Sequence, residues 1–143
     1  MLKNIPAIIS PELMKIIMEM GHGDEIVFAD GNFPAATKAQ RLVRCDGHGT
    51  SELLDAILRF FPLDTYVEAP VGVMEVVPGD NVVPTVWEEY KTIIQKHEGQ
   101  ERKIEHIERF EFYNRAEQAY AIVATSDSAL YANLILKKGV VAE

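Results

Sequence analysis

The chain has 143 residues, of which 48% are hydrophobic and 25% charged, so we expect one globular domain over residues 1–143. Its net charge of −8 argues against nucleic acid and anionic membrane surfaces as partners, because both require a basic face. No apolar run is long enough to span a bilayer, and the N-terminus lacks the core of a signal peptide. The single Cys45 fits a reducing compartment, so we expect a cytoplasmic protein.

The first third of the chain predicts a helix, a strand and a loop. A serine, a proline and an acid at residues 10–12 are typical of a helix start. Apolar residues at helical spacing continue to Met20, and Gly21 ends the helix. Residues 25–29 predict a strand whose nearly continuous apolar side chains favour burial on both faces of a sheet. Residues 31–35 predict a loop.

The remaining elements continue this alternation. A strand is expected at 41–45, a turn at 46–49, and a helix that Thr50 or Ser51 caps and Pro62 ends. Helices that alternate with strands predict an α/β layered fold. The other expected elements are a strand at 71–77, a helix at 84–97, an ambiguous short strand at 104–108, a helix at 110–118, and strands at 120–125 and 130–136.

A histidine between two glycines is the most informative local feature. Gly21 and Gly23 flank His22, and glycine allows a positive φ or close approach of a ligand to the backbone. Histidine exchanges protons near neutral pH, so the segment predicts a small-molecule site that a histidine serves. The alternative is a polar cap at the helix C-terminus, although one glycine is enough for a cap.

Four further polar residues lie near expected strand ends: Asp30, Arg109, Tyr131 and Asn133. Each has an ordinary structural explanation, such as a turn for Asp30 or a surface ion pair with a neighbouring glutamate for Arg109. Asn133 is the least ordinary, because a buried amide in an apolar strand must find hydrogen-bond partners.

Metal binding and nucleophilic catalysis are weaker alternatives. His22, Asp24, Asp30 and His48 could be drawn as ligands, but the sequence has no short-range metal-binding motif. Cys45 lies in an expected strand and fits a small buried hydrophobic residue better than a nucleophile.

Four ordered blocks carry a resemblance that covers essentially the whole chain. They read ISPELMKIIMEMGHGDEIVFADGNFPA, LDTYVEAP, IERFEFYNRA and ALYANLILKKGV. The chain resembles the D-ribose pyranase/L-fucose mutarotase family, and within it the L-fucose mutarotase branch. The ribose branch tends to carry a histidine in the region of Arg109, which favours fucose over ribose.

The resemblance implies an isomerase that interconverts sugar anomers on a three-layer α/β/α sandwich. It implies His22 as the proton donor and sugar contacts from Asp30, Arg109, Tyr131, Ala132 and Asn133. Ala132 stands where the family usually has glycine, which matters if that position needs a positive φ. The resemblance also implies a homo-oligomer, a large ring that is commonly a decamer, with sites near subunit contacts.

The implied reaction needs a group that gives and takes a proton near neutral pH, a role that histidine suits. It requires no metal, nucleotide or covalent intermediate, so we expect no cofactor. Phe33 and Met74 are candidates for an apolar wall beside the C6 methyl of L-fucose. The alternatives are a D-ribose pyranase, a non-catalytic monosaccharide-binding module, and a metal-dependent sugar isomerase or aldolase.

Overall fold

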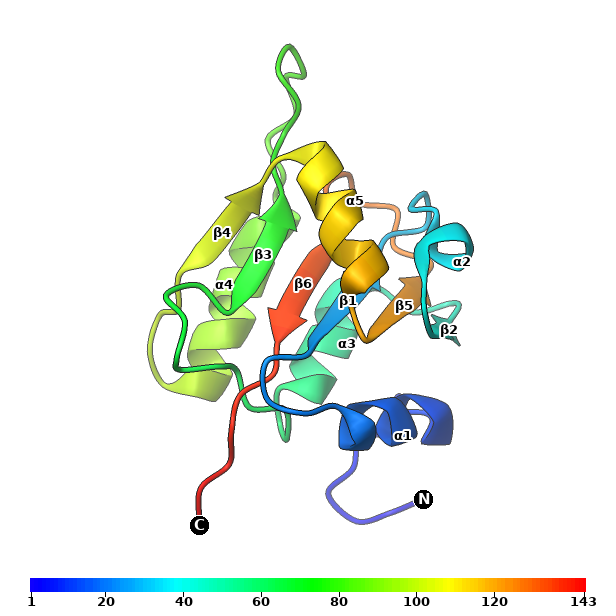
Figure 1. The fold of residues 1–143 in the computed structure, drawn as a ribbon, viewed down its shortest axis with the longest axis vertical. Helices are drawn as coiled ribbons and strands as arrows, with labels where there is room; N and C mark the ends of the chain where they lie inside the picture. Colours follow the sequence, from blue (N-terminus) through cyan, green and yellow to red (C-terminus); the bar gives the residue numbers. More distant parts are fainter.

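Six strands form a single mixed sheet with helices on both faces (Figure 1). A computed structural model describes residues 1–143. None of its helices combines the length and the apolar character needed to cross a bilayer. The elements in chain order are α1 (Pro11–Glu19), β1 (Glu25–Ala29), α2 (Ala35–Lys38), β2 (Leu42–Cys45), α3 (Thr50–Ile57), β3 (Val71–Met74), α4 (Val86–Glu98), β4 (Ile104–Ile107), α5 (Arg109–Gln118), β5 (Ala121–Thr125) and β6 (Leu134–Lys137).

The strand order across the sheet is β2-β5-β1-β6-β3-β4. Only β6 runs antiparallel to its neighbours, β1 and β3, whereas the other pairs are parallel. The carboxyl ends of five strands and the amino end of β6 therefore meet at one edge of the sheet, which we call the upper edge because it lies at the top of Figure 1. The lower edge holds the amino ends of the five strands and the carboxyl end of β6.

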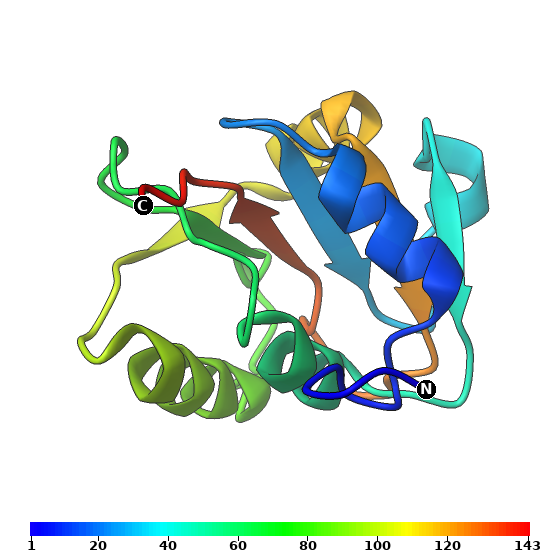
Figure 2. The same ribbon diagram turned by 90° about the horizontal axis from the view of Figure 1, so that it is seen from below.

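Alternating side chains of the central strand face two separate cores. Ile26 and Phe28 belong to the core on the side of α1, α3 and α4, whereas Val27 and Ala29 belong to the core on the side of α2 and α5. All four are fully buried, as expected for a strand covered on both faces. Helices thus cover both faces of the sheet (Figure 2), and the expected three-layer α/β/α sandwich is confirmed.

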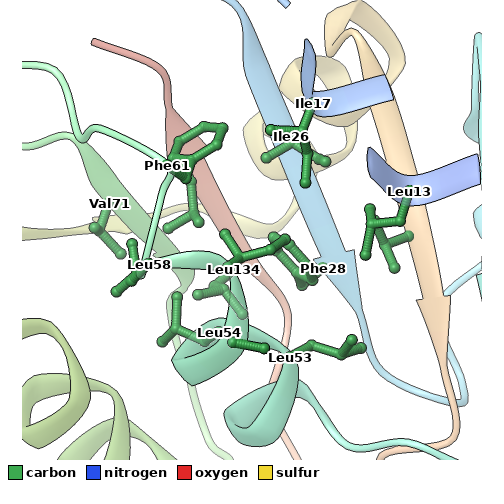
Figure 3. Close-up of a cluster of buried hydrophobic side chains, with 14 of the residues drawn as sticks. Leu13, Ile17, Ile26, Phe28, Leu53, Leu54, Leu58, Phe61, Val71 and Leu134 are labelled. Carbon is green, nitrogen blue, oxygen red and sulfur yellow. The ribbon is translucent and has the colours of Figure 1, made fainter. Parts of the chain in front are cut away.

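The larger core packs two helices against the middle of the sheet. Leu13 and Ile17 of α1 and Leu53 and Leu54 of α3 meet the side chains of β1 and β6 (Figure 3). Burying such a side chain fully stabilises the fold by about 1.5–3 kcal/mol. Ser10 fixes the start of α1, because its hydroxyl oxygen accepts a hydrogen bond from the Leu13 N–H at 3.1 Å.

Two predicted strands are shorter than the sequence pattern indicated. The strand expected at 71–77 ends at Met74, because its neighbour β4 ends at the paired residue Ile107. The strand expected at 130–136 starts only at Leu134, because Tyr131 has a φ of 58°, which is incompatible with extended backbone. Tyr131 and Asn133 therefore precede β6 rather than lie within it.

Two smaller differences concern helices. The short α2 overlaps the loop expected at 31–35 only at Ala35 and otherwise lies where no element was expected, because four residues are too few for a recognisable helical pattern. Thr50 is the first residue of α3 rather than its cap, since Gly49 is the N-cap residue. The Thr50 N–H instead donates to the carboxylate of Asp127 in the β5–β6 connection, at 2.8 Å.

The lower edge is closed by a close contact between the C-terminal segment and the segment before β3. The Gly139 N–H donates to the Pro62 carbonyl at 2.8 Å. A Cβ at Gly139 would lie 2.6 Å from the Leu63 carbonyl oxygen and 2.8 Å from the Asp64 Cα. Both neighbours are backbone atoms, so neither can move away without shifting the chain.

We expect Gly139→Ala to destabilise the protein by about 1–3 kcal/mol, because an inserted methyl group must displace backbone. Gly21→Ala is the matched control, since the nearest atom to its Cβ lies at an ordinary 3.7 Å. Urea unfolding of both variants measures the difference. Equal unfolding free energies for the two variants would contradict the close packing at Gly139.

Candidate functional site

A polar pocket opens at the upper edge of the sheet, where β1, β3 and β4 end and β6 begins. Its volume is about 340 Å³, which lies within the usual range for small-molecule sites. Four of the six expected site residues line it, and His22 and Ala132 do not. The lining residues are Asp30, Asn32, Phe33, Met74, Asp80, Arg109, Tyr113, Leu130, Tyr131 and Asn133.

A larger hollow of about 820 Å³ lies among the N-terminal residues 1–19. Its lining is mostly apolar and its only charged side chains are Lys15 and Glu19. Those two residues approach each other to 3.7 Å as an exposed ion pair. The hollow therefore lacks the convergent polar groups that characterise a site for chemistry, and we place the candidate site in the smaller pocket.

Asp30 and Asn133 hold each other by two hydrogen bonds across the junction of β1 and β6. The Asn133 amide oxygen accepts from the Asp30 N–H at 2.8 Å, and the amide nitrogen donates to the Asp30 carboxylate at 3.2 Å. Both residues are buried, and these bonds provide the hydrogen-bond partners that a buried Asn133 amide was expected to need. The pair fixes the direction of the Asp30 carboxylate at the base of the pocket.

Burial raises the pKa of Asp30 above its ordinary value, and the negative charge of Asp127 adds to this effect. Hydrogen bonds from the Asn32 and Phe33 N–H groups and from Asn133 oppose it. The result is a carboxylate whose oxygens are partly desolvated but still able to accept hydrogen bonds from a ligand.

Arg109 is the cation of the pocket. It is the first residue of α5, directly after the N-cap Glu108, whose carboxylate accepts from the Phe110 and Glu111 N–H groups at 3.0 Å. These bonds lower the pKa of Glu108 and fix the first turn of the helix. Arg109 forms no ion pair within the chain, so its guanidinium remains available to a ligand.

Tyr131 reaches the pocket from the other side. Its hydroxyl donates to the Asp80 carboxylate at 2.6 Å and accepts from the Val77 N–H at 3.3 Å. The bond to Asp80 raises the pKa of Tyr131, so the phenol keeps its proton at neutral pH. Its single proton is already donated to Asp80, so towards a ligand the hydroxyl oxygen acts as a hydrogen-bond acceptor.

Aromatic and thioether groups form one wall. The ring of Phe33 lies 5.5 Å from that of Tyr113, and the Arg109 guanidinium lies 5.7 Å from the same Tyr113 ring. Met74, at the end of β3, is buried beside them. The pocket thus offers both apolar and polar sides, as sites for small polar molecules require.

Ala132 does not line the pocket, which differs from the sugar contact implied by the resemblance. Its side chain is completely buried in the core on the other side of the sheet. The residue with a positive φ is Tyr131, so alanine at position 132 causes no backbone strain. The carbonyl oxygen of Ala132 accepts a hydrogen bond from the Tyr90 hydroxyl.

His22 lies at the lower edge of the sheet, whereas the pocket lies at the upper edge. It precedes β1, whereas Asp30 follows this strand, and five strand residues span roughly 17 Å. Asp30 therefore cannot orient His22 within one chain. His22 does not cap α1 either, because the C-cap residue of this helix is Met20.

The partner of His22 is Asp64, a residue that sequence reasoning did not single out. The His22 Nε2 atom lies 3.0 Å from an Asp64 carboxylate oxygen, and the Asp64 side chain is only 3% exposed against 46% for His22. Burial alone would raise the pKa of Asp64, but hydrogen bonds from the Tyr66 N–H and from His22 and the charge of Lys137 hold it below its usual range. Asp64 is thus an ionised, fixed acceptor for the imidazole.

The candidate metal ligands are not assembled. His22 and Asp24 lie at the lower edge, whereas Asp30 and His48 lie at the upper edge after β1 and β2. No group of three histidine, cysteine or carboxylate side chains is close enough to hold a metal ion. The structure therefore separates the residues from which a metal site was drawn.

Sequence reasoning missed Asp64, Asp80 and Tyr113. Asp64 lies in the block LDTYVEAP and Tyr113 in the block IERFEFYNRA, so both were present in the matching segments without a stated role. Asp80 lies between the strand expected at 71–77 and the helix expected at 84–97, and had no expected role. None of the three belongs to a short sequence motif, because each contacts its partner only in the folded chain.

The chain is similar to proteins of known activity over nearly its whole length. A fucose mutarotase of Homo sapiens is 52% identical over 147 residues, which cover 99% of this chain and 95% of the human protein. An L-fucose mutarotase of Actinobacillus pleuropneumoniae is 50% identical over 140 residues, with coverage of 98% and 97%.

A solved structure has the same fold. The fucose mutarotase of Streptococcus pneumoniae, in complex with L-fucose, superposes with a TM-score of 0.94 at 53% identity and covers 99% of this chain and 100% of its own. The model of the RbsD / FucU transport protein family matches residues 3–141. The family expected from the four sequence blocks is confirmed: this chain belongs to the RbsD / FucU family.

Proposed function

We propose that this protein is an L-fucose mutarotase, an isomerase that interconverts the α and β anomers of L-fucose. The main support is its identity of about half or more with fucose mutarotases over nearly the full length of both chains. The pocket adds a physical argument, because its groups match what a 6-deoxy sugar presents. We assign Asp30, Arg109, Tyr131 and Asn133 to the binding of the sugar.

These side chains have complementary hydrogen-bonding roles. The Asp30 carboxylate accepts from sugar hydroxyls, while the Arg109 guanidinium donates to sugar oxygens in a rigid fork. Asn133 acts mainly through Asp30, since both ends of its amide are bonded to that residue. Phe33, Met74 and Tyr113 provide an apolar surface for the C6 methyl group, which distinguishes L-fucose from L-galactose.

We infer that His22 reaches the pocket from a second copy of the chain. Within one chain the upper edge holds a sugar-sized pocket without a histidine, and the lower edge holds His22, which is exposed and lies apart from the residues of that pocket. Beside His22, the segment before β3 presents Tyr66, which is 77% exposed and whose ring lies 5.2 Å from the imidazole. Contact between the two edges of neighbouring copies unites the two half-sites, in the ring-shaped homo-oligomer that the resemblance implies.

The reaction itself is a pair of proton transfers. Ring opening moves a proton onto the ring oxygen and removes one from the anomeric hydroxyl, and closure on the other face of the carbonyl reverses both steps. A single imidazole can serve both directions, because its two protonation states are similarly accessible near neutral pH. We assign this role to His22.

Asp64 fixes the form of His22 that is needed. When the His22 Nε2–H donates to the Asp64 carboxylate, the lone pair of the neutral imidazole lies on Nδ1. Nδ1 then faces outward as the atom that exchanges protons with the sugar. Asp64 also stabilises the imidazolium that forms during each turnover, because it is ionised and only 3.0 Å away.

The primary experiment is saturation-transfer proton NMR on L-fucose at anomeric equilibrium. We expect the wild-type protein to accelerate anomer exchange, and His22→Ala to lose about 10²–10⁴ of that rate, the usual contribution of general acid–base catalysis. D-Ribose and L-galactose serve as comparison sugars. Faster exchange with D-ribose favours the pyranase, whereas saturable binding without exchange favours a non-catalytic binding module.

A second experiment tests whether one site uses two chains. His22→Ala and Asp30→Asn are each expected to be inactive alone, whereas an oligomer assembled from equal amounts of both contains intact sites at about a quarter of its interfaces. Coexpression with two different affinity tags and exchange NMR on the purified mixed oligomer measure this recovery. A mixed oligomer with no more activity than its two parents would contradict a site shared between copies.

A third experiment removes the ionised partner of the histidine. We expect Asp64→Asn to lower the exchange rate about tenfold, a part of the full contribution of acid–base catalysis, because the imidazole loses its fixed tautomer.

The folded state also has a lowered Asp64 pKa, so this carboxylate stabilises the fold above the ordinary aspartate pKa of about 3.9 and loses that effect as the pH falls below it. Between pH 5 and 2, at about one-unit steps, wild type should therefore lose unfolding free energy more steeply than the variant.

Asp55→Asn is the matched control for this experiment. Asp55 pairs with His97 at 2.7 Å, a second histidine–aspartate pair that lies between α3 and α4 and lines no part of the pocket. We expect this variant to keep the wild-type exchange rate. An equal loss of exchange in both variants would show that Asp64 has no particular role.

A further inference from the structure

The segment that carries Tyr131 and Asn133 has an unfavourable backbone conformation. Tyr131 has a φ of 58°, in the left-handed region that costs free energy for a residue with a Cβ. Ala132 points into the core behind the sheet, whereas its two neighbours line the pocket. Such a segment keeps one conformation only when surrounding groups determine it.

Helix α4 provides two hydrogen-bond donors to this segment. The Trp87 indole N–H donates to the Tyr131 carbonyl at 2.9 Å, and the Tyr90 hydroxyl donates to the Ala132 carbonyl at 2.5 Å. Trp87 and Tyr90 are three residues apart, so they lie on the same face of the helix. Two successive carbonyl groups are therefore fixed by one turn of a helix that lies behind the pocket. We call Trp87 and Tyr90 the donor pair.

The Tyr90 hydroxyl also contacts Thr50, the first residue of α3. The Thr50 hydroxyl donates to the Tyr90 hydroxyl at 2.6 Å, while the Thr50 N–H donates to the Asp127 carboxylate at 2.8 Å. Asp127 is on the β5–β6 connection and also accepts from the Gly31 N–H through its backbone carbonyl. Burial raises the pKa of Tyr90, so its hydroxyl stays protonated and remains a donor at physiological pH.

We propose that Trp87 and Tyr90 are positioning residues for catalysis, which hold Tyr131 and Asn133 in the geometry that the sugar requires. This inference rests on the function proposed above. Neither residue lines the pocket, so neither touches the sugar. Their effect passes through the two carbonyl groups and thereby sets the direction of the Tyr131 hydroxyl and the Asn133 amide.

A double-mutant cycle tests this route. We expect Trp87→Phe to lower fucose exchange at saturating sugar about tenfold, since small misplacements of a site group have effects of up to about a hundredfold. In a Tyr131→Phe background the same change should lower exchange less than about threefold, because the group that it positions is already absent. An equal factor in both backgrounds, or no loss in the single variant, would overturn the proposal.

Hydrogen exchange provides a readout that does not depend on the sugar. We expect the backbone amides of residues 130–134 to exchange at least about tenfold faster in Tyr90→Phe than in Ile94→Val. Ile94 is a buried residue of the same helix, so this control removes a methyl group from the core and leaves the donor pair intact. Equal exchange in the two variants would overturn the proposal.

The two experiments separate the possible failures. A wild-type protein that does not accelerate fucose exchange would refute the proposed function, and hydrogen exchange would still decide whether the donor pair holds the segment. An active wild type with additive effects in the cycle would refute the positioning role alone.

Discussion

The antiparallel placement of β6 between β1 and β3 is the constraint on which the pocket depends. If β6 ran parallel to its neighbours, the segment before it would lie at the lower edge, and Tyr131 and Asn133 would be separated from Asp30. The reversed direction instead places the residues before β6 beside the residues after β1. The two hydrogen bonds between Asp30 and Asn133 then join the two segments into one rigid base.

The same topology separates His22 from the pocket within one copy, as the proposed site shared between copies requires. The upper edge of one copy gathers a carboxylate, a guanidinium and a phenol, while its lower edge gathers an imidazole and the buried carboxylate that orients it. Each group is fixed by local bonds before any partner arrives: Glu108 fixes the turn of Arg109 and Asp64 fixes His22. Such preorganisation limits the entropy that a second copy would need to remove on assembly.

The sequence predicted the layers and most of the elements, because nearly continuous apolar strands and periodic helices are local patterns. It also supplied four of the pocket residues through their positions near strand ends and through the family resemblance. The strand expected at 25–29 already separates His22 from Asp30, but the sequence did not show which of the two the other groups would join. Strand direction and order depend on contacts between segments more than a hundred residues apart, such as Asp30 and Asn133. Asp64 and Asp80 were missed for the same reason, because each becomes recognisable only beside its tertiary partner.

The separation of His22 from the pocket also bears on how catalytic capacity scales with the amount of protein. If a complete site needs two chains, the catalytic unit obeys mass action, and dilution below the dissociation constant of the assembly removes activity while every chain stays folded. Specific activity would then rise with protein concentration until assembly is complete. A cell that makes little of this protein would have disproportionately little mutarotation. The rate of the reaction would then depend on expression level more steeply than in direct proportion.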